Sequence, residues 1–215
     1  MLINDLLALH RTAVRASIDV VERVSVADLG RPTPCSEWTV AGLLAHMTAQ
    51  HHGFAAAAWG KGGDLAAWEV RPLGSHPVAE YVEAAEDLLV VFAEPEVPQR
   101  MFELPEFGAS FPAEQAISFH LIDYVVHGWD VARSLGLDYR LAPELAEPAL
   151  GIALMVPDGA GRLEPDAPFG PVVDAGGADP LRRILATLGR SPDWSPADSG
   201  QQLGQRPQRP VPRAR

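Results

Sequence analysis

The sequence predicts an all-α fold, a bundle of four long helices followed by additional short C-terminal helices. Apolar residues recur at steps of three and four along four long segments, which is the spacing that places them on one face of a helix. Glycine and proline lie between these segments and mark the breaks. The length of 215 residues fits one domain, at about 100 to 200 residues per domain. We expect this domain to span residues 1–192.

The first predicted helix covers residues 3–28, and Gly30 and Pro32 end it. Its inner face consists of apolar residues spaced by three, four or seven positions, namely Ile3, Leu7, Val14, Ile18 and Val21. Residues 31–38 hold two prolines and should form an extended connector. Thr39 is then well placed as the N-cap of a second helix over residues 40–58, because its hydroxyl can accept a hydrogen bond from the first turn.

A glycine-rich break separates the second helix from a third one, predicted over residues 78–92. Prolines at both ends of the segment 95–112 indicate a loop. The fourth helix is predicted over residues 113–135, and Gly136 is the expected residue just past its C-terminus. Four long amphipathic helices of this kind form a bundle.

Two shorter helices are predicted over residues 143–155 and 179–188, with a loop-like stretch at 159–177 between them. Residues 193–215 are rich in proline, arginine and glutamine and offer almost nothing apolar to bury. Ordering such a segment costs more conformational entropy than burial returns. We therefore expect a disordered tail.

The chain is acidic, with a formal net charge of −11 and a pI near 5.0. Nucleic acid and anionic lipid need a concentrated basic surface, so both are poor partners. No run of about 18 or more apolar residues is present to span a bilayer, and the first residues lack the order of a signal peptide. The single cysteine, Cys35, cannot form an internal disulfide, which fits a reducing compartment. We expect a cytoplasmic protein.

Asp123 and His127 are separated by four positions in the fourth predicted helix. Side chains at i and i+4 lie one above the other on the same helix face. This pair falls beside the apolar stripe of its helix, at the edge of the bundle interior. An imidazole and a carboxylate that project together can chelate a divalent ion, and a third ligand from another helix would leave positions open for water or substrate.

The second predicted helix offers three histidines as the third ligand, His46, His51 and His52. Geometry alone slightly favours His51, because it lies at the centre of the apolar stripe of this helix. His46 lies on the flank of that stripe, where a side chain can reach a diagonal neighbour. His52 points to solvent.

Two stretches of sequence carry a resemblance to a known family: PTPCSEWTVAGLLAHM at residues 32–47 and DYVVHGWDVARSLG at residues 123–136. With these motifs the chain resembles the DinB-like metal-binding families of actinobacteria. The group concerned is related to the metal-binding domain of mycothiol-dependent maleylpyruvate isomerase. The resemblance covers about residues 3–192 and includes FGP at 169–171 and LGRSP at 188–192.

The resemblance implies a DinB-like four-helix bundle with up-down-down-up topology. It also implies a metal held by a histidine of the second helix and by an i, i+4 pair of a later helix, which here are His46, Asp123 and His127. It favours His46 over His51. Characterised relatives are thiol-dependent isomerases and transferases that use mycothiol, bacillithiol or glutathione. The chain differs from the isomerase in having Asp123 at the position of a glutamate, and the isomerase's C-terminal substrate-binding portion is not recognisable.

The leading hypothesis is a metalloenzyme of thiol-dependent transferase or isomerase chemistry on a small molecule, with mycothiol as the cosubstrate. Nitrogen and oxygen donors admit zinc, nickel, manganese or iron, and zinc is our choice. The competing hypothesis is a non-catalytic bundle that binds or senses a metal or small ligand, or that forms a homodimer through exposed helical faces. A metal-free bundle in which Asp123 pairs with His127 is a third interpretation.

Several other polar residues have simpler interpretations. His10 falls on the inner face of the first helix, where a hydrogen-bonded core histidine is the commoner outcome than a pocket residue. His120 lies one turn before Asp123 and could be a replacement ligand or a pocket base. Asp130 could replace Asp123 as a ligand, although an ion pair with Arg133 explains it without a metal.

Cys35 could be a nucleophile or a ligand, but its place in a proline-flanked connector favours a small buried side chain. Trp38 and Trp129 are most simply packing residues. Three arginines near the last helix could bind an anionic substrate or interact with the helix dipole. These are Arg182, Arg183 and Arg190.

Overall fold

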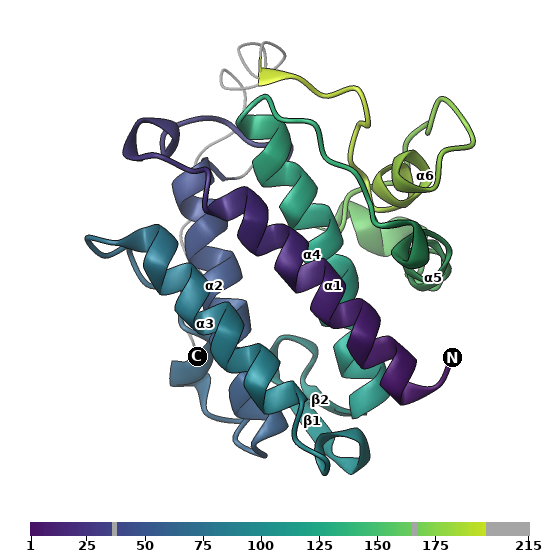
Figure 1. Cartoon of the computed structure of the whole chain (residues 1–215). Coiled ribbons are helices and arrows are strands. Elements are labelled where there is room, and N and C mark those ends of the chain that lie inside the picture. Colours follow the sequence, from purple (N-terminus) through teal and green to yellow (C-terminus); the bar gives the residue numbers. More distant parts are fainter. Residues whose placement is uncertain (36–37, 165–166, 197–215) are drawn as a thin grey trace.

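The computed structural model describes residues 1–35, 38–164 and 167–196. Within these residues the fold is mostly helical, as the periodicity predicts. Six α-helices are described: α1 (Ile3–Val21), α2 (Val40–Ala58), α3 (Pro77–Phe92), α4 (Ala113–Ser134), α5 (Pro143–Ala153) and α6 (Pro180–Thr187). Figure 1 shows α1 to α4 as the bundle, with α5 and α6 together at one side of it.

The helices α1 and α4 run in the same direction. His10 of α1 contacts His120 in the first half of α4. Arg31, in the connector that leads from α1 to α2, donates a hydrogen bond to the carbonyl of Ser134 at the end of α4. The helix α3 runs opposite to α1, because its first turns reach Ser17 through Tyr81.

The helix α2 runs opposite to α4. Near the start of α2, His46 faces His127 in the second half of α4, with ring centroids 5.4 Å apart. Near the end of α2, Phe54 faces His120, with centroids 4.7 Å apart. The directions of the four helices therefore follow the expected up-down-down-up order, and the long connection between α2 and α3 allows these two to run the same way.

The first helix is shorter than predicted. It ends at Val21, and residues 26–28 form a separate 3₁₀ turn. The reason is a capping box in which the Asp28 carboxylate accepts hydrogen bonds from both the backbone N–H and the hydroxyl of Ser25. These local hydrogen bonds compete with continuation of the helix.

The segment predicted as a loop at 95–112 contains a β-hairpin instead. The strands β1 (Met101–Leu104) and β2 (Ala109–Pro112) pair antiparallel, with Met101 opposite Pro112. Phe102 and Leu104 are buried beneath the hairpin while their neighbours are exposed, which is the alternation of a half-buried strand. The prolines at 105 and 112 lie at the turn and at the strand end, where they disrupt no pairing.

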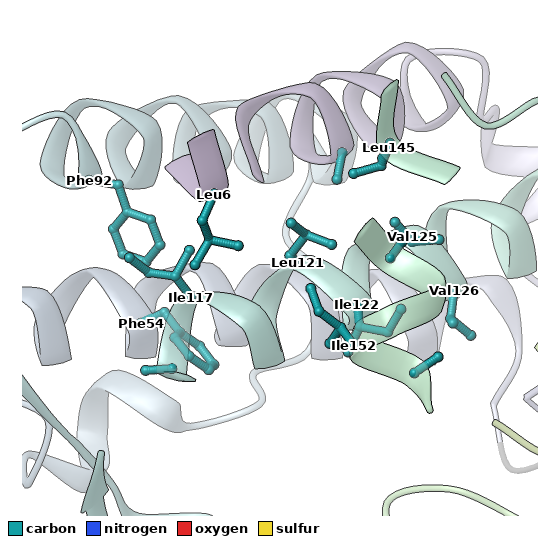
Figure 2. Close-up of a cluster of buried hydrophobic side chains, with 14 of the residues drawn as sticks. Leu6, Phe54, Phe92, Ile117, Leu121, Ile122, Val125, Val126, Leu145 and Ile152 are labelled. Carbon is teal, nitrogen blue, oxygen red and sulfur yellow. The ribbon is translucent and has the colours of Figure 1, made fainter. Parts of the chain in front are cut away.

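The core lies between the four long helices and extends to α5 and α6. Figure 2 shows Leu6 of α1, with Ile117 and Leu121 of α4, filling the space between these helices. Each fully buried side chain of this size contributes about 1.5–3 kcal/mol relative to exposure. A second cluster that includes Leu43, Leu44 and Met47 of α2 packs near the other end of α4. This packing fixes the ends of α2 and α4 that carry the predicted ligands.

The two short C-terminal helices are confirmed, with α5 ending at Ala153 and α6 spanning Pro180–Thr187. The stretch between them contains a 3₁₀ turn, Ala160–Leu163. The predicted tail begins at residue 193, yet Asp193 pairs with Arg182 and Trp194 packs against the core. Residues 197–215 of that tail lie outside the described residues. In the part of the chain that the structure describes, no helix is long and apolar enough to cross a membrane.

Candidate metal centre

Three side chains predicted as ligands converge between α2 and α4. His46, Asp123 and His127 each place one donor atom within 4.8 Å of the other two. Nε2 of His127 lies 3.2 Å from Oδ1 of Asp123. Donors of a tetrahedral zinc ion lie about 3.3 Å apart, given bond lengths of about 2.0–2.1 Å. The His127 and Asp123 atoms therefore already match that spacing, and the donor of His46 lies within 4.8 Å of both.

A hydrogen bond from a side chain of α4 to the backbone of α2 helps to position these donors. Tyr124 follows Asp123 on α4, and its buried hydroxyl donates a hydrogen bond to the carbonyl oxygen of Met47, which follows His46 on α2. This bond ties together the two turns that carry the ligands. Because both residues belong to the packed core, the separation of the ligands is set by packing and not by flexible loops.

Trp38 fixes the ring of His46 from the connector that precedes α2. The two rings stack with centroids 4.4 Å apart and an interplanar angle of 30°. The indole also lies 6.0 Å from the ring of His127. We interpreted Trp38 from the sequence as a packing residue, and the structure shows that it packs directly against the candidate ligands.

The charges of the three groups suit a cation. Burial and the neighbouring His127 lower the pKa of His46 to about 4, so that its imidazole is neutral near pH 7. Burial opposes the charge on His127, but Asp123 and Asp130 outweigh it and raise the pKa of His127 to about 9. Burial likewise opposes the charge of Asp123, yet His127 and His46 keep the pKa of that carboxyl below its usual value. A divalent ion would take the place of the His127 proton beside Asp123.

Asp130 lies on the other side of the His127 ring. Its Oδ2 is 3.0 Å from Nδ1 of His127, and the nitrogens of Arg190 approach the same carboxylate at 3.2 to 3.3 Å. Asp130 is therefore a partner of a candidate ligand, and it lies outside the group of three converging donors. The sequence suggested an ion pair between Asp130 and Arg133. The structure instead pairs Asp130 with Arg190, and Arg133 donates a hydrogen bond to the carbonyl of Trp194.

The family description "Mycothiol maleylpyruvate isomerase N-terminal domain" matches residues 10–132, more than half of the chain and all three candidate ligands. The chain belongs to this family. Two uncharacterised proteins of Mycobacterium tuberculosis, from strains CDC 1551 and H37Rv, are each 30% identical over 194 residues. In both cases the match covers 87% of this chain and 98% of the relative.

Two solved structures share the fold of this family member. The mycothiol-dependent maleylpyruvate isomerase superposes with a TM-score of 0.60 at 16% identity, covering 90% of this chain and 91% of that one. A histidine-to-alanine variant of that isomerase gives a TM-score of 0.58 at 15% identity, covering 71% and 68% of the two chains. These matches confirm the DinB-like helical bundle expected from the resemblance.

Other histidines of this domain lie outside the group of three candidate ligands. His51, which wheel geometry slightly favoured, is buried and stacks on Tyr124, with centroids 4.2 Å apart. His10 and His120 contact each other through ring nitrogens 2.9 Å apart. The exposed His52 points to solvent, as predicted. His46 joins the ligand group because the flank of α2, and not its centre, faces Asp123 and His127.

The structure also defines the surroundings of four further residues that the sequence singled out. Trp129 is a buried packing residue, as expected. Cys35 is partly buried in the connector. Arg182 pairs with Asp193 and Arg190 with Asp130, so the structure gives both arginines a carboxylate of this chain in place of an anionic substrate.

Proposed function

We propose that this protein is a metal-dependent enzyme that uses a low-molecular-weight thiol, of the mycothiol type, in a transferase or isomerase reaction on a small molecule. His46, Asp123 and His127 hold the metal. The observation that carries the proposal is the convergence of these three donors from two helices, with their donor atoms within 4.8 Å. Membership of the mycothiol maleylpyruvate isomerase family supports the choice of thiol.

Three protein donors favour a reactive site over a structural one. Structural zinc sites are closed by four protein ligands, whereas catalytic sites keep a position open for water or substrate. The side chain of Asp123 is 26% exposed, and His46 is only partly buried, so the site opens to solvent on this side. When bound, the metal supplies a positive charge that lowers the pKa of a bound thiol and so increases its nucleophilicity.

The protein's own residues supply orientation and charge balance. The neutral imidazoles of His46 and of metal-bound His127, with the single negative charge of Asp123, leave a divalent ion with one net positive charge. Trp38 covers the ring of His46 and restricts its rotation. Nitrogen and oxygen donors admit zinc, nickel, manganese or iron, and of these we propose zinc.

Cobalt substitution tests the thiol directly. Co²⁺ would be added to the metal-free protein, and the absorption spectrum recorded before and after addition of mycothiol. Coordination of a thiolate to cobalt produces a strong charge-transfer band in the near ultraviolet, and we expect this band with the parent protein. The His46→Ala variant should lose it, whereas the exposed His52→Ala variant on the same helix should keep it.

A cobalt spectrum that does not respond to mycothiol, glutathione or bacillithiol would contradict the thiol role. It would instead favour a non-catalytic bundle that binds or senses the metal. A thiol-dependent band would justify a screen for turnover, in which thiol and small electrophiles or unsaturated acids are incubated with the zinc-loaded protein. Turnover should then fall to the background rate in His46→Ala and remain in His52→Ala.

A further inference from the structure

We infer that Arg190 is a positioning residue for the proposed metal site. It reaches Asp130 from the C-terminal part of the chain, and Asp130 in turn orients the ligand His127. This inference rests on the proposed function, because it concerns how one of the proposed ligands is held. Arg190 lies beyond the residues matched by the family description, 10–132, so the match itself does not include it.

The two ring nitrogens of His127 have different partners. Nδ1 is 3.0 Å from Oδ2 of Asp130, and Nε2 faces Oδ1 of Asp123. A carboxylate accepts hydrogen bonds only, so Asp130 requires Nδ1 to carry a proton. Once the metal is bound, the lone pair of His127 therefore lies on Nε2, directed at the space shared with His46 and Asp123. Carboxylates that hold a ligating histidine in this way are a common feature of metal sites.

Asp130 depends on Arg190 because it is completely buried. Its side chain has no exposed surface, and that of Arg190 is 7% exposed. An isolated buried charge is strongly disfavoured, so the Asp130 carboxylate needs a paired cation. Arg190 provides it through Nε and Nη2, which approach the carboxylate at 3.2 to 3.3 Å. The planar fork also fixes the orientation of the carboxylate.

The turn that follows α6 places Arg190 beside Asp130. Gly189 adopts a left-handed conformation with φ of +76°, and a Cβ there would lie 2.7 Å from the backbone of Gly170. The backbone N–H of Arg190 then donates to the carbonyl of Leu185, 2.8 Å away. The turn thus directs the arginine side chain from α6 back toward α4. We conclude that the C-terminal segment completes the site formed by α2 and α4.

A purely structural role would be an ion pair that attaches the C-terminal segment to the bundle. The chain offers a matched control for that role. Arg182 forms a two-pronged ion pair with Asp193 in the same segment, at 2.8 and 2.9 Å, without contacting a ligand. Arg182→Met therefore removes an ion pair within the C-terminal segment only. Arg190→Met removes the cation that pairs with Asp130, the partner of His127.

The experiment compares Arg190→Met, Arg190→Lys, Asp130→Asn and Arg182→Met with the parent protein. The Co²⁺ and Zn²⁺ dissociation constants, the cobalt absorption spectrum and the thermal unfolding midpoint of the metal-free form would be measured for each. We expect the metal affinity of Arg190→Met and Asp130→Asn to be about 10- to 100-fold weaker, which is typical when the partner of a ligating histidine is lost. The cobalt spectrum should change as well.

Arg190→Lys keeps the charge and should recover part of the lost affinity, and Arg182→Met should bind metal like the parent. If Arg190→Met does not fold, the double variant Arg190→Met, Asp130→Asn carries the test, because it leaves neither member of the buried ion pair unpaired. Parent-like affinity and spectrum in folded Arg190→Met, or in that double variant, would overturn the role of Arg190 while leaving the metal site intact. A parent protein that binds no metal would overturn the proposed function and, with it, this inference.

Discussion

His10 of α1 and His120 of α4 meet in the interior of the bundle, with Nε2 of His10 2.9 Å from Nδ1 of His120. One of these nitrogens must donate and the other accept, which requires at least one neutral imidazole. Burial, with a contribution from Arg11, lowers the pKa of His10 to about 3. Burial also lowers the pKa values of His120 and His51 well below their usual range. The fold therefore holds three neutral histidines, one from each of three helices.

This histidine group predicts a loss of stability in mild acid. An unfolded histidine binds a proton below about pH 6.5, whereas folded His10 stays neutral down to about pH 3. Between these values the unfolded state binds more protons, so the contribution of these histidines to the free energy of unfolding falls as the pH falls and is constant above the window. His10 faces His120 from α4 and Phe92 from α3, and although Asp123 opposes the lowering of the His51 pKa, burial outweighs that opposition.

Urea unfolding at pH 7.5, 6.0 and 5.0 measures this dependence. Each histidine should contribute about 1.4 kcal/mol per pH unit once the pH is well below 6.5. His52→Ala, which removes an exposed histidine, should show the same slope as the parent. A slope between pH 6.0 and 5.0 no steeper than that between 7.5 and 6.0 would show that these histidines are not neutral and buried.

His51 should be replaceable by an apolar residue at no cost in stability. Neither of its ring nitrogens has a hydrogen-bond partner among the described residues, although the side chain is fully buried. An unpaired buried polar group costs about 1–3 kcal/mol, so His51→Leu should leave the free energy of unfolding unchanged or raise it by about 1 kcal/mol.

The matched variant is His10→Leu, which removes the partner of His120 and should lower the free energy of unfolding by about 1–3 kcal/mol. Both values would be measured by urea unfolding at pH 7.5. If His51→Leu is instead the more damaging of the two, its nitrogens have a bonded partner, such as an internal water.

Gly189 should tolerate alanine poorly. Its φ of +76° is unfavourable for other residues, and an added Cβ would lie 2.7 Å from the backbone of Gly170. Gly136 has a nearly equal φ of +73° with nothing within 4 Å of the added carbon, so Gly136→Ala isolates the conformational cost of about 1 kcal/mol. We expect Gly189→Ala to cost about 1–3 kcal/mol more, because of the steric overlap. Equal unfolding midpoints for the two variants would rule out the close crossing of residues 170 and 189.

The sequence was sufficient for the helices but not for all of their boundaries. The period of 3.6 residues predicts α2 and α4 to within one residue, because Thr39 and Gly136 are local end signals. The end of α1 was misplaced because apolar residues continue past Val21, while the Ser25 and Asp28 cap interrupts the helix. The hairpin was missed because four-residue strands beside prolines give too short an alternation to distinguish from a loop.

The candidate site could be predicted only in part. The i, i+4 spacing identified Asp123 and His127, but the choice of His46 over His51 needed the family resemblance, since both lie on or beside the inner face of α2. Arg190 carried no local signal, because it meets Asp130 across 60 positions of sequence. Such a contact depends on how α6 packs, which periodicity does not describe.

Metal content tests the central claim most directly. The parent protein, purified without an affinity tag, would be analysed by elemental mass spectrometry beside His46→Ala, His127→Ala and the exposed control His52→Ala. We expect about one equivalent of a divalent metal in the parent and the control, and its loss in both ligand variants. A parent protein that holds no metal even after reconstitution, or a folded His127→Ala that retains the full equivalent, would contradict a metal site at His46, Asp123 and His127.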